Sequence, residues 1–224
     1  MGSKRKRRGG QEVAFRRRLL SWWRHAARDL PWRRTRDPYR VLVSEFMLQQ
    51  TQVSRVAEYY PRFLERFPDL QSLARAPARA VREAWDGLGY YARARNLHAL
   101  ARGVTRRHDG KLPDTPEELI KLPGIGPYTA GAVATFAFEK SVPAVDTNVS
   151  RVLRRVFWGR ATGNGQRAAQ VWRLARKLVP RNGRQAWTFN QAIMELGALV
   201  CVARKPKCAV CPVQPVCKTG KSKG

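Results

Sequence analysis

Apolar residues recur at intervals of three and four positions along most of the chain, and no stretch keeps up an alternation of apolar and polar positions. This spacing is typical of amphipathic helices rather than of strands. Glycine and proline fall between the periodic segments, where they end helices. We predict helices over residues 15–23, 38–48, 53–67, 80–87, 92–107, 116–121, 127–138, 149–157, 168–178 and 189–199. The pattern therefore predicts an all-α fold.

The charge of the chain is strongly one-sided. Lysine and arginine number 44 and the acids number 16, which gives a net charge of +28 on 224 residues. Such a charge opposes compaction unless a polyanion neutralises it, so DNA or RNA is the expected partner. We expect no membrane partner, because no apolar run is long enough to cross a bilayer and no secretory segment is evident. Residues 1–10 are expected to form a basic disordered tail, and residues 218–224 a shorter basic tail.

All four cysteines of the chain, Cys201, Cys208, Cys211 and Cys217, fall within seventeen positions. The prolines between them prevent a helix or strand through this segment, so a bound metal is expected to fold it. Four cysteines can hold either zinc or an iron–sulfur cluster. Zinc ribbons pair two Cys-x2-Cys arms, whereas only one is present here, which favours iron–sulfur. Disulfides are the remaining alternative, and the lack of a secretory segment argues against them.

A glycine-rich turn lies between two predicted helices, in Leu122-Pro-Gly124-Ile-Gly126-Pro127-Tyr128. Glycines leave backbone N–H groups uncovered, and Pro127 suits the first turn of the next helix. Backbone donors at a helix N-terminus can bind a DNA phosphate, which makes Gly124 and Gly126 candidate binding residues. An ordinary helix–helix turn is the alternative.

Two carboxylates are candidates for chemistry. Glu45 lies in a mostly apolar helical segment, where burial would raise its pKa into the range of a general acid. Asp146 lies at a predicted helix start, where terminal amides would keep it ionised and able to face a developing cation. The alternatives are a solvent-facing glutamate and a plain N-cap aspartate.

The cysteine spacing, the glycine-rich turn and the segments around Leu30-Pro-Trp-Arg33, Glu45 and Asp146 together resemble the endonuclease III and MutY family of DNA base-excision glycosylases. The resemblance implies two helical lobes with the active site in the groove between them. One lobe is a six-helix barrel with a helix–hairpin–helix, over residues 38–145. The other combines residues 11–37 with residues 146–217 and carries a 4Fe-4S cluster.

The resemblance also implies residue roles. Glu45 would protonate an adenine on its imidazole nitrogen, and Asp146 would stabilise the cationic sugar. Bifunctional members carry lysine where this chain has Tyr128, so a monofunctional enzyme is implied. The Tyr128 hydroxyl is expected to bond the sugar or Asp146. Thr147 departs from the glycine common in MutY-like members.

DNA-binding residues follow from the same resemblance. Gln50 and Tyr90 match residues that wedge into the duplex beside an extruded base; packing of Tyr90 or Tyr91 in the core is the alternative. Arg33 and Gln191 match positions of the base pocket. The cluster loop would present further basic side chains to phosphate, namely Arg204, Lys205 and Lys207.

The implied function is base excision repair by a monomer that hydrolyses the N-glycosidic bond of adenine mispaired with guanine or 8-oxoguanine in double-stranded DNA. The alternatives are a T:G thymine glycosylase, disfavoured by Leu48-Gln-Gln-Thr51, and a non-catalytic mismatch or abasic-site binding module. The expected location is the cytoplasm or nucleoid of a prokaryote, or the nucleus or mitochondrion of a eukaryote. MutY proteins continue into a domain that recognises oxidised guanine, and this sequence ends seven residues after Cys217.

Overall fold

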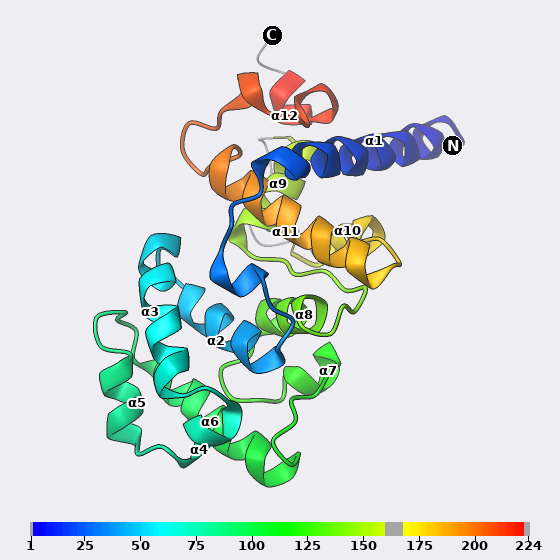
Figure 1. Cartoon of the computed structure of the whole chain (residues 1–224). Helices are drawn as coiled ribbons and strands as arrows, with labels where there is room; N and C mark the ends of the chain where they lie inside the picture. Colours follow the sequence, from blue (N-terminus) through cyan, green and yellow to red (C-terminus); the bar gives the residue numbers. More distant parts are fainter. Residues whose placement is uncertain (1, 160–167, 222–224) are drawn as a thin grey trace. The chain divides into compact units, whose positions relative to one another are not determined.

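The computed structural model describes residues 2–159 and 168–221, and every regular element in this part of the chain is helical (Figure 1). The predicted all-α fold is confirmed. The elements are α1 (Gly2–Ala26), η1 (Pro31–Arg33), α2 (Pro38–Leu48), α3 (Val53–Arg66), α4 (Leu70–Arg75), α5 (Ala78–Ala84), α6 (Ala92–Arg107), α7 (Pro116–Leu119), α8 (Pro127–Phe136), α9 (Thr147–Phe157), α10 (Ala168–Leu178), α11 (Gly183–Leu199), η2 (Cys208–Val210), η3 (Gln214–Val216) and α12 (Lys218–Lys221).

The chain divides into two compact units. The central unit is Asp29–Lys140, and the terminal unit combines Met1–Arg28 with Ser141–Gly224. The domain borders implied by the resemblance, at 37/38 and 145/146, stay a prediction.

Helix α2 is the core of the central unit. Asp37 caps it by accepting the backbone N–H of Arg40 at 2.8 Å, and Pro38 occupies the first turn. Tyr39 and all residues from Val41 to Met47 are buried, because α2 packs against α3, α6 and α8; Arg40 is exposed. Helices α4 and α5 pack on α6, with the fully buried Trp85 contacting Phe63 edge-on at 5.7 Å. Because α2 is buried on nearly every side, it needs no broad polar face, which explains its mostly apolar sequence.

The terminal unit has its own core. Phe15, Leu19 and Trp23 of α1 belong to a buried cluster with side chains of α9, α10 and α11. Just beyond the end of α1, the Arg28 side chain donates two hydrogen bonds of 2.7 Å to the buried carboxylate of Glu195 on α11. Residues far apart in the sequence are thereby joined in one unit.

Some elements differ from the predictions. Helix α4 was not predicted; it is too short for its apolar period to show, but Asp69 and Ser72 form a capping box at its start. Helix α11 begins at Gly183 instead of 189, because Asn182 caps it.

The described part of each predicted tail is helical, while residues 1 and 222–224 lie outside the described residues. Helix α1 begins at Gly2, so it includes most of the segment expected to be disordered; lysine and arginine are good helix formers and continue the anchored helix. Residues Lys218–Lys221 form α12, which packs on α9 and buries Thr219. The Thr219 hydroxyl donates to the Arg155 carbonyl at 3.0 Å, a contact that charge composition does not reveal.

Candidate functional site

Glu45 is buried within the central unit. Its side chain lies on α2 and the residue is 4 % exposed, so the alternative of a solvent-facing glutamate is wrong. The Tyr128 hydroxyl, from the first turn of α8, donates to Glu45 Oε2 at 2.7 Å. The packing of α8 on α2 therefore places a phenol beside a carboxyl group in an apolar setting. Tyr128 was expected to bond the sugar or Asp146, and its bond to Glu45 was not predicted.

The glycine-rich turn lies directly beside this pair of helices. Gly124 has a φ of +76°, which favours glycine, and a Cβ there would lie 2.7 Å from Asn96 Cβ and 2.9 Å from Phe46 Cε1. Gly126 is the N-cap of α8, and a Cβ on it would meet nothing within 4 Å. Gly124 thus lets the turn approach α2 and α6 closely, while Gly126 leaves space at the N-terminus of α8 for an anion.

Asp146 caps α9 in the terminal unit. Its Oδ1 accepts the Val149 N–H at 2.6 Å and its Oδ2 accepts the Asn148 side-chain N–H at 2.8 Å. Burial raises the pKa of Asp146 above its usual value, and the bonds from Val149 and Asn148 oppose that rise. Desolvation is therefore the larger of the effects on this pKa, and the predicted ionised state of Asp146 stays a prediction.

A chain of hydrogen bonds connects Asp146 with the cysteine loop. Arg151 donates to Asn148 Oδ1 at 2.7 Å, to the Gly197 carbonyl at 2.8 Å and to the Cys201 carbonyl at 2.8 Å. Asn148 in turn donates to Asp146. Asn148 and Arg151 were not among the residues predicted from the sequence. Their positions two and five residues after Asp146, at the start of the helix that Asp146 caps, were the available signal.

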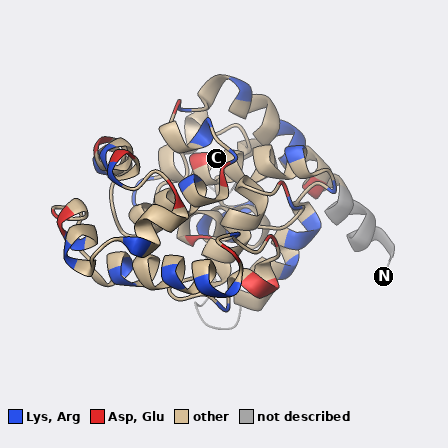
Figure 2. Cartoon of the chain, turned by 60° about the horizontal axis from the view of Figure 1, so that its bottom comes forward, with Lys and Arg blue, Asp and Glu red and all other residues tan. Residues whose placement is uncertain are grey.

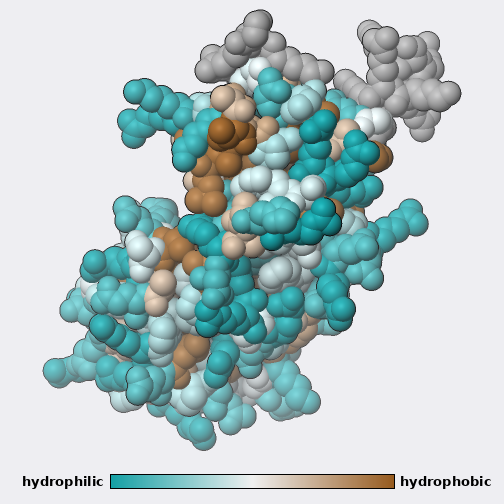
Figure 3. Space-filling model, turned by 45° about the horizontal axis from the view of Figure 1, so that its top comes forward, coloured by the Kyte–Doolittle hydropathy of each residue, from teal (hydrophilic) through white to brown (hydrophobic). Residues whose placement is uncertain are grey.

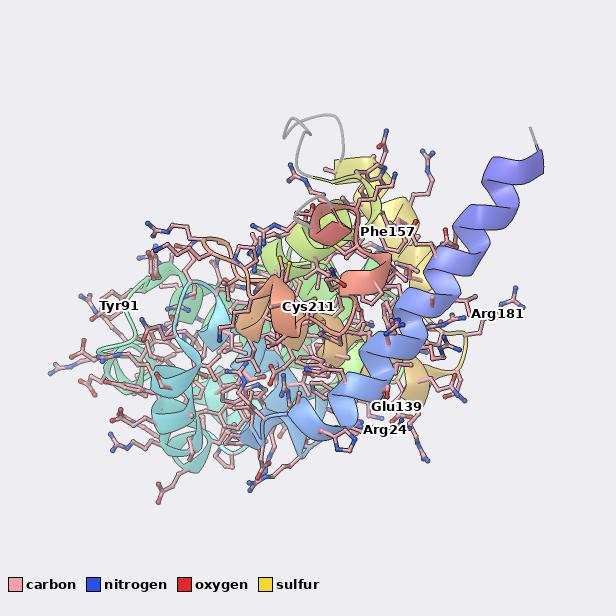
Figure 4. All side chains as sticks on the ribbon, turned by 90° about the horizontal axis from the view of Figure 1, so that it is seen from above. Arg24, Tyr91, Glu139, Phe157, Arg181 and Cys211 are labelled. Carbon is pink, nitrogen blue, oxygen red and sulfur yellow. The ribbon has the colours of Figure 1, made fainter. Side chains whose placement is uncertain are left out.

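The four cysteines line one pocket, together with Arg155, Gln214 and Thr219 among others. All four are free thiols, and burial raises the pKa of Cys211 to about 11 and also raises the pKa of Cys217. Neutral buried thiols become thiolates when a metal binds them. Figure 4 shows Cys211 beside other sulfur atoms in this part of the terminal unit.

Four cysteines that line one pocket could hold either kind of metal group. A zinc site holds its sulfurs about 2.3 Å from one ion, whereas an iron–sulfur cluster spreads its cysteine ligands over several iron atoms.

Arg155 organises the loop that carries the first cysteine. Its guanidinium donates to the carbonyls of Cys201, Val202 and Ala203 at 3.2, 2.7 and 2.8 Å and contacts Cys201 Sγ at 3.4 Å. Behind the last cysteine, the Gly220 N–H approaches Cys217 Sγ at 3.4 Å. Two N–H donors therefore face ligand sulfurs from this chain.

The two expected wedge residues occupy exposed, left-handed positions in the central unit. Gln50 has a φ of +58° and Tyr90 a φ of +47°, and Tyr90 is 60 % exposed. Tyr91 is half-buried and donates its hydroxyl to Asp86. Of the paired tyrosines, Tyr90 is therefore the one available to a partner.

The remaining candidates divide between the units. Arg33 is half-buried in η1 of the central unit, while Gln191 is 6 % exposed on α11 of the terminal unit. Arg204, Lys205 and Lys207 are exposed in the cysteine loop. Glu45, Tyr128, Gly124, Gly126, Gln50, Tyr90 and Arg33 belong to the central unit, and Asp146, Gln191 and the cysteines belong to the terminal unit. The groove expected between the lobes stays a prediction.

The surface matches a basic, polar protein. Lysines and arginines recur on many helices (Figure 2), and the face in Figure 3 is mostly hydrophilic with small separate apolar areas. Among the described residues, no helix combines the length and apolar character needed to cross a membrane.

Comparison with known proteins gives two family matches. Residues 43–189 match the HhH-GPD superfamily of base excision DNA repair proteins, and residues 201–217 match the iron-sulfur binding domain of endonuclease III. The second match spans all four cysteines, so this segment is an iron–sulfur binding domain.

Individual relatives agree with these matches. The chain is 46 % identical over 225 residues to an adenine DNA glycosylase of Rattus norvegicus, covering 95 % of this chain but only 43 % of the relative. Among solved structures, a thermostable thymine-DNA glycosylase superposes with a TM-score of 0.88 at 31 % identity, over 96 % of this chain and 98 % of that one. A trapped endonuclease III–DNA covalent intermediate superposes with a TM-score of 0.79 at 25 % identity, over 100 % of this chain and 99 % of that one.

Proposed function

Because the chain belongs to the HhH-GPD superfamily of base excision DNA repair proteins, we propose that it is a monofunctional adenine-DNA glycosylase. Its substrate would be adenine mispaired with guanine or 8-oxoguanine in double-stranded DNA. The observation that carries the proposal is the buried Glu45 carboxyl group with the Tyr128 hydroxyl 2.7 Å away. A carboxyl group buried among apolar side chains is suited to give a proton to a base.

In the proposed reaction, the proton of the Glu45 carboxyl group moves to an imidazole nitrogen of the extruded adenine. The bond between the base and C1′ of the sugar then breaks, and its electron pair leaves with the base. The sugar becomes cationic, and the carboxylate of Asp146 stabilises that charge. Water adds to C1′ and loses a proton, which completes the hydrolysis.

Tyr128 accounts for the monofunctional character. A lysine at this position could form a Schiff base with the abasic sugar, whereas a phenol cannot. Tyr128 instead holds the carboxyl group of Glu45 in one orientation through its hydrogen bond.

The iron–sulfur group is proposed to be a 4Fe-4S cluster held by Cys201, Cys208, Cys211 and Cys217. When bound, it would cross-link a loop whose regular structure is limited to the short helices η2 and η3. The exposed side chains of Arg204, Lys205 and Lys207 would then be held toward the DNA backbone.

The substrate assignment rests on similarity to adenine DNA glycosylases. A T:G thymine glycosylase is a second candidate, because a thymine-DNA glycosylase shares the fold closely. The higher sequence identity to the rat relative and the Leu48-Gln-Gln-Thr51 segment favour adenine. We further propose that the protein acts as a monomer on chromosomal DNA, in the nucleoid of a prokaryote or the nucleus or mitochondrion of a eukaryote.

The test is base release from three duplexes that hold A:8-oxoguanine, A:G or T:G at one position. We expect adenine release from the first two and none from the third. Glu45→Gln should abolish release while leaving DNA affinity largely intact, and Glu58→Gln, on the exposed side of α3, should change neither. Release from T:G alone would establish the second candidate. Tight binding without release from any duplex would identify a non-catalytic binding module.

A further inference from the structure

Arg93 on α6 is a buried cation in the central unit, 7 % exposed. In the described part of the chain its guanidinium has no carboxylate partner; its partners are backbone carbonyls and aromatic rings. Burial lowers the pKa of this arginine from its usual value, the direction expected when a cation loses water without gaining an anion. An apolar side chain of similar size would avoid that desolvation. The contribution of Arg93 therefore lies in its hydrogen bonds to the backbone carbonyls and not in packing alone.

The carbonyls belong to two separate segments. Nη1 donates to Phe46 and Met47 at 3.1 and 2.7 Å and also to Gln49, all at the C-terminal end of α2. These carbonyls have no partner within the helix, and the negative end of the helix dipole favours a cation there. Nη2 donates to the carbonyls of Leu88 and Gly89, both at 3.1 Å, in the loop before α6. The planar guanidinium thus joins the end of α2 to the 88–89 loop.

Each segment leads directly into an exposed residue with strained backbone. Gln50 follows Gln49 with a φ of +58°, and Tyr90 follows Gly89 with a φ of +47°. Left-handed conformations of this kind cost about 1 kcal/mol or more in non-glycine residues and persist only where the surroundings fix them. Arg93 also lies 5.4 Å from the Tyr90 ring centroid.

Other contacts hold only one of the two segments. Arg55 Nε donates to the Gly87 carbonyl at 2.8 Å, and the Trp85 indole donates to the Gly89 carbonyl at 3.2 Å. Both act on the 87–89 loop and not on the end of α2. Among the described side chains, Arg93 is the one whose hydrogen bonds reach both.

We propose that Arg93 is a positioning residue that holds Gln50 and Tyr90 as one rigid pair for insertion into the DNA duplex. The inference rests on the proposed function, in which these two residues fill the gap left by the extruded adenine. Insertion by a preorganised pair avoids the entropy of ordering two loops on binding. Arg93 therefore acts on base extrusion without touching the base.

The experiment is a double-mutant cycle on the holoprotein with an A:G duplex. Single-turnover adenine release is measured for Arg93→Met, for Gln50→Ala/Tyr90→Ala, and for the combination. Base extrusion is followed separately, by the fluorescence of 2-aminopurine in place of the target adenine. We expect Arg93→Met to lower release and extrusion by about tenfold, within the range of measured interaction energies between coupled residues. In the background that lacks Gln50 and Tyr90, the same substitution should have little further effect.

Two controls separate positioning from folding and from charge. Arg93→Lys keeps the charge but not the planar, forked guanidinium, so it should recover part of the extrusion signal. If Arg93→Met does not fold, Arg93→Lys replaces it in the cycle. Arg106→Met removes an exposed arginine from the last turn of the same helix and should leave extrusion unchanged.

The outcomes distinguish the two proposals. Equal losses from the Arg93 substitution in both backgrounds, or release lowered with extrusion unchanged, would overturn the positioning role and leave the glycosylase activity standing. If the wild-type protein releases no adenine from the duplex, the proposed function itself is wrong.

Discussion

Gly197 offers a sharp test of the connection between α11 and Asp146. It lies within α11, and a Cβ at this position would be 2.7 Å from Asn148 Cβ and 3.2 Å from the carbonyl carbon and oxygen of Asn148. Ordinary contact begins near 3.4 Å, so Gly197→Ala requires a local shift of about 0.7 Å. The neighbour that must shift is the residue that donates to Asp146 Oδ2.

Two opposing effects set the change in stability. Alanine favours a helix interior over glycine by about 1 kcal/mol, while overpacking a well-packed site costs about 1–3 kcal/mol. We expect a net loss of about 1 kcal/mol, which corresponds to a fall in Tm of roughly 2–4 °C for a chain of this length. The loss in activity should be larger. Misplacement by about 1 Å near a reacting centre can lower a rate by as much as about 10²-fold, so we expect adenine release to fall at least about tenfold.

Thermal unfolding and single-turnover release from an A:G duplex measure both effects. The matched control is Gly103→Ala in α6, where a Cβ would meet only the movable end of the Arg107 side chain, at 3.0 Å. That variant should be as stable as the wild type or more so, with unchanged release. The reasoning is refuted if Gly197→Ala gains stability as Gly103→Ala does and releases adenine at the wild-type rate.

Three further substitutions test other parts of the site. Asp146→Asn keeps the N-cap acceptor and removes the charge, so release should fall by about 10²-fold or more. The pKa of Asp146 is raised in the folded protein, so ionisation of this group lowers the free energy of unfolding as the pH rises through that pKa. Relative to the wild type, Asp146→Asn should therefore gain more stability at pH 7 than at pH 4 in urea unfolding. Lys205→Ala should lower the slope of log affinity against log salt by about one unit in DNA-binding titrations. Cys208→Ser should reduce bound iron and the visible absorbance of the holoprotein, and loosen residues 201–217 in hydrogen exchange.

Each of these has a contradicting result. A larger gain at pH 4 than at pH 7 would reverse the electrostatic account of Asp146. An unchanged salt slope would remove Lys205 from the DNA interface; Lys111→Ala, an exposed lysine in the central unit, serves as its comparison. Full iron content in Cys208→Ser would mean that this cysteine is not a ligand.

The helical fold could be predicted because burial leaves a periodic record. Helix α6 was predicted with its observed ends, Ala92 and Arg107, since its apolar positions follow one face over four turns. Helix α4 has six residues, which is too short for a period to stand out, and its capping box is the only clear signal. Helices were hardest to predict where they are defined by capping residues rather than by apolar residues along one face.

The site could be predicted only in part. Glu45 was recognisable as an acid among apolar neighbours, and Asp146 as an N-cap, because each signal is local. The bond from Tyr128 to Glu45 joins residues 83 positions apart, and it depends on how α8 packs against α2. The effect of burial on the pKa of Asp146 likewise depends on what surrounds the carboxyl group, which helix-end reasoning does not supply.

The abundance of arginine explains why Arg93, Arg151 and Arg155 were not recognised from the sequence. With 44 basic residues and 16 acids, the chain cannot pair most of its cations with carboxylates, so charge patterning says little about which arginines are structural. The structure shows another solution: Arg93 and Arg155 use backbone carbonyls, and Arg151 uses carbonyls and an amide oxygen. Carbonyls left without partners at helix ends and in loops are good acceptors for a guanidinium, which can reach several at once. In so basic a chain, these buried or half-buried arginines hold separate backbone segments together, and each of the three lies beside a candidate functional residue.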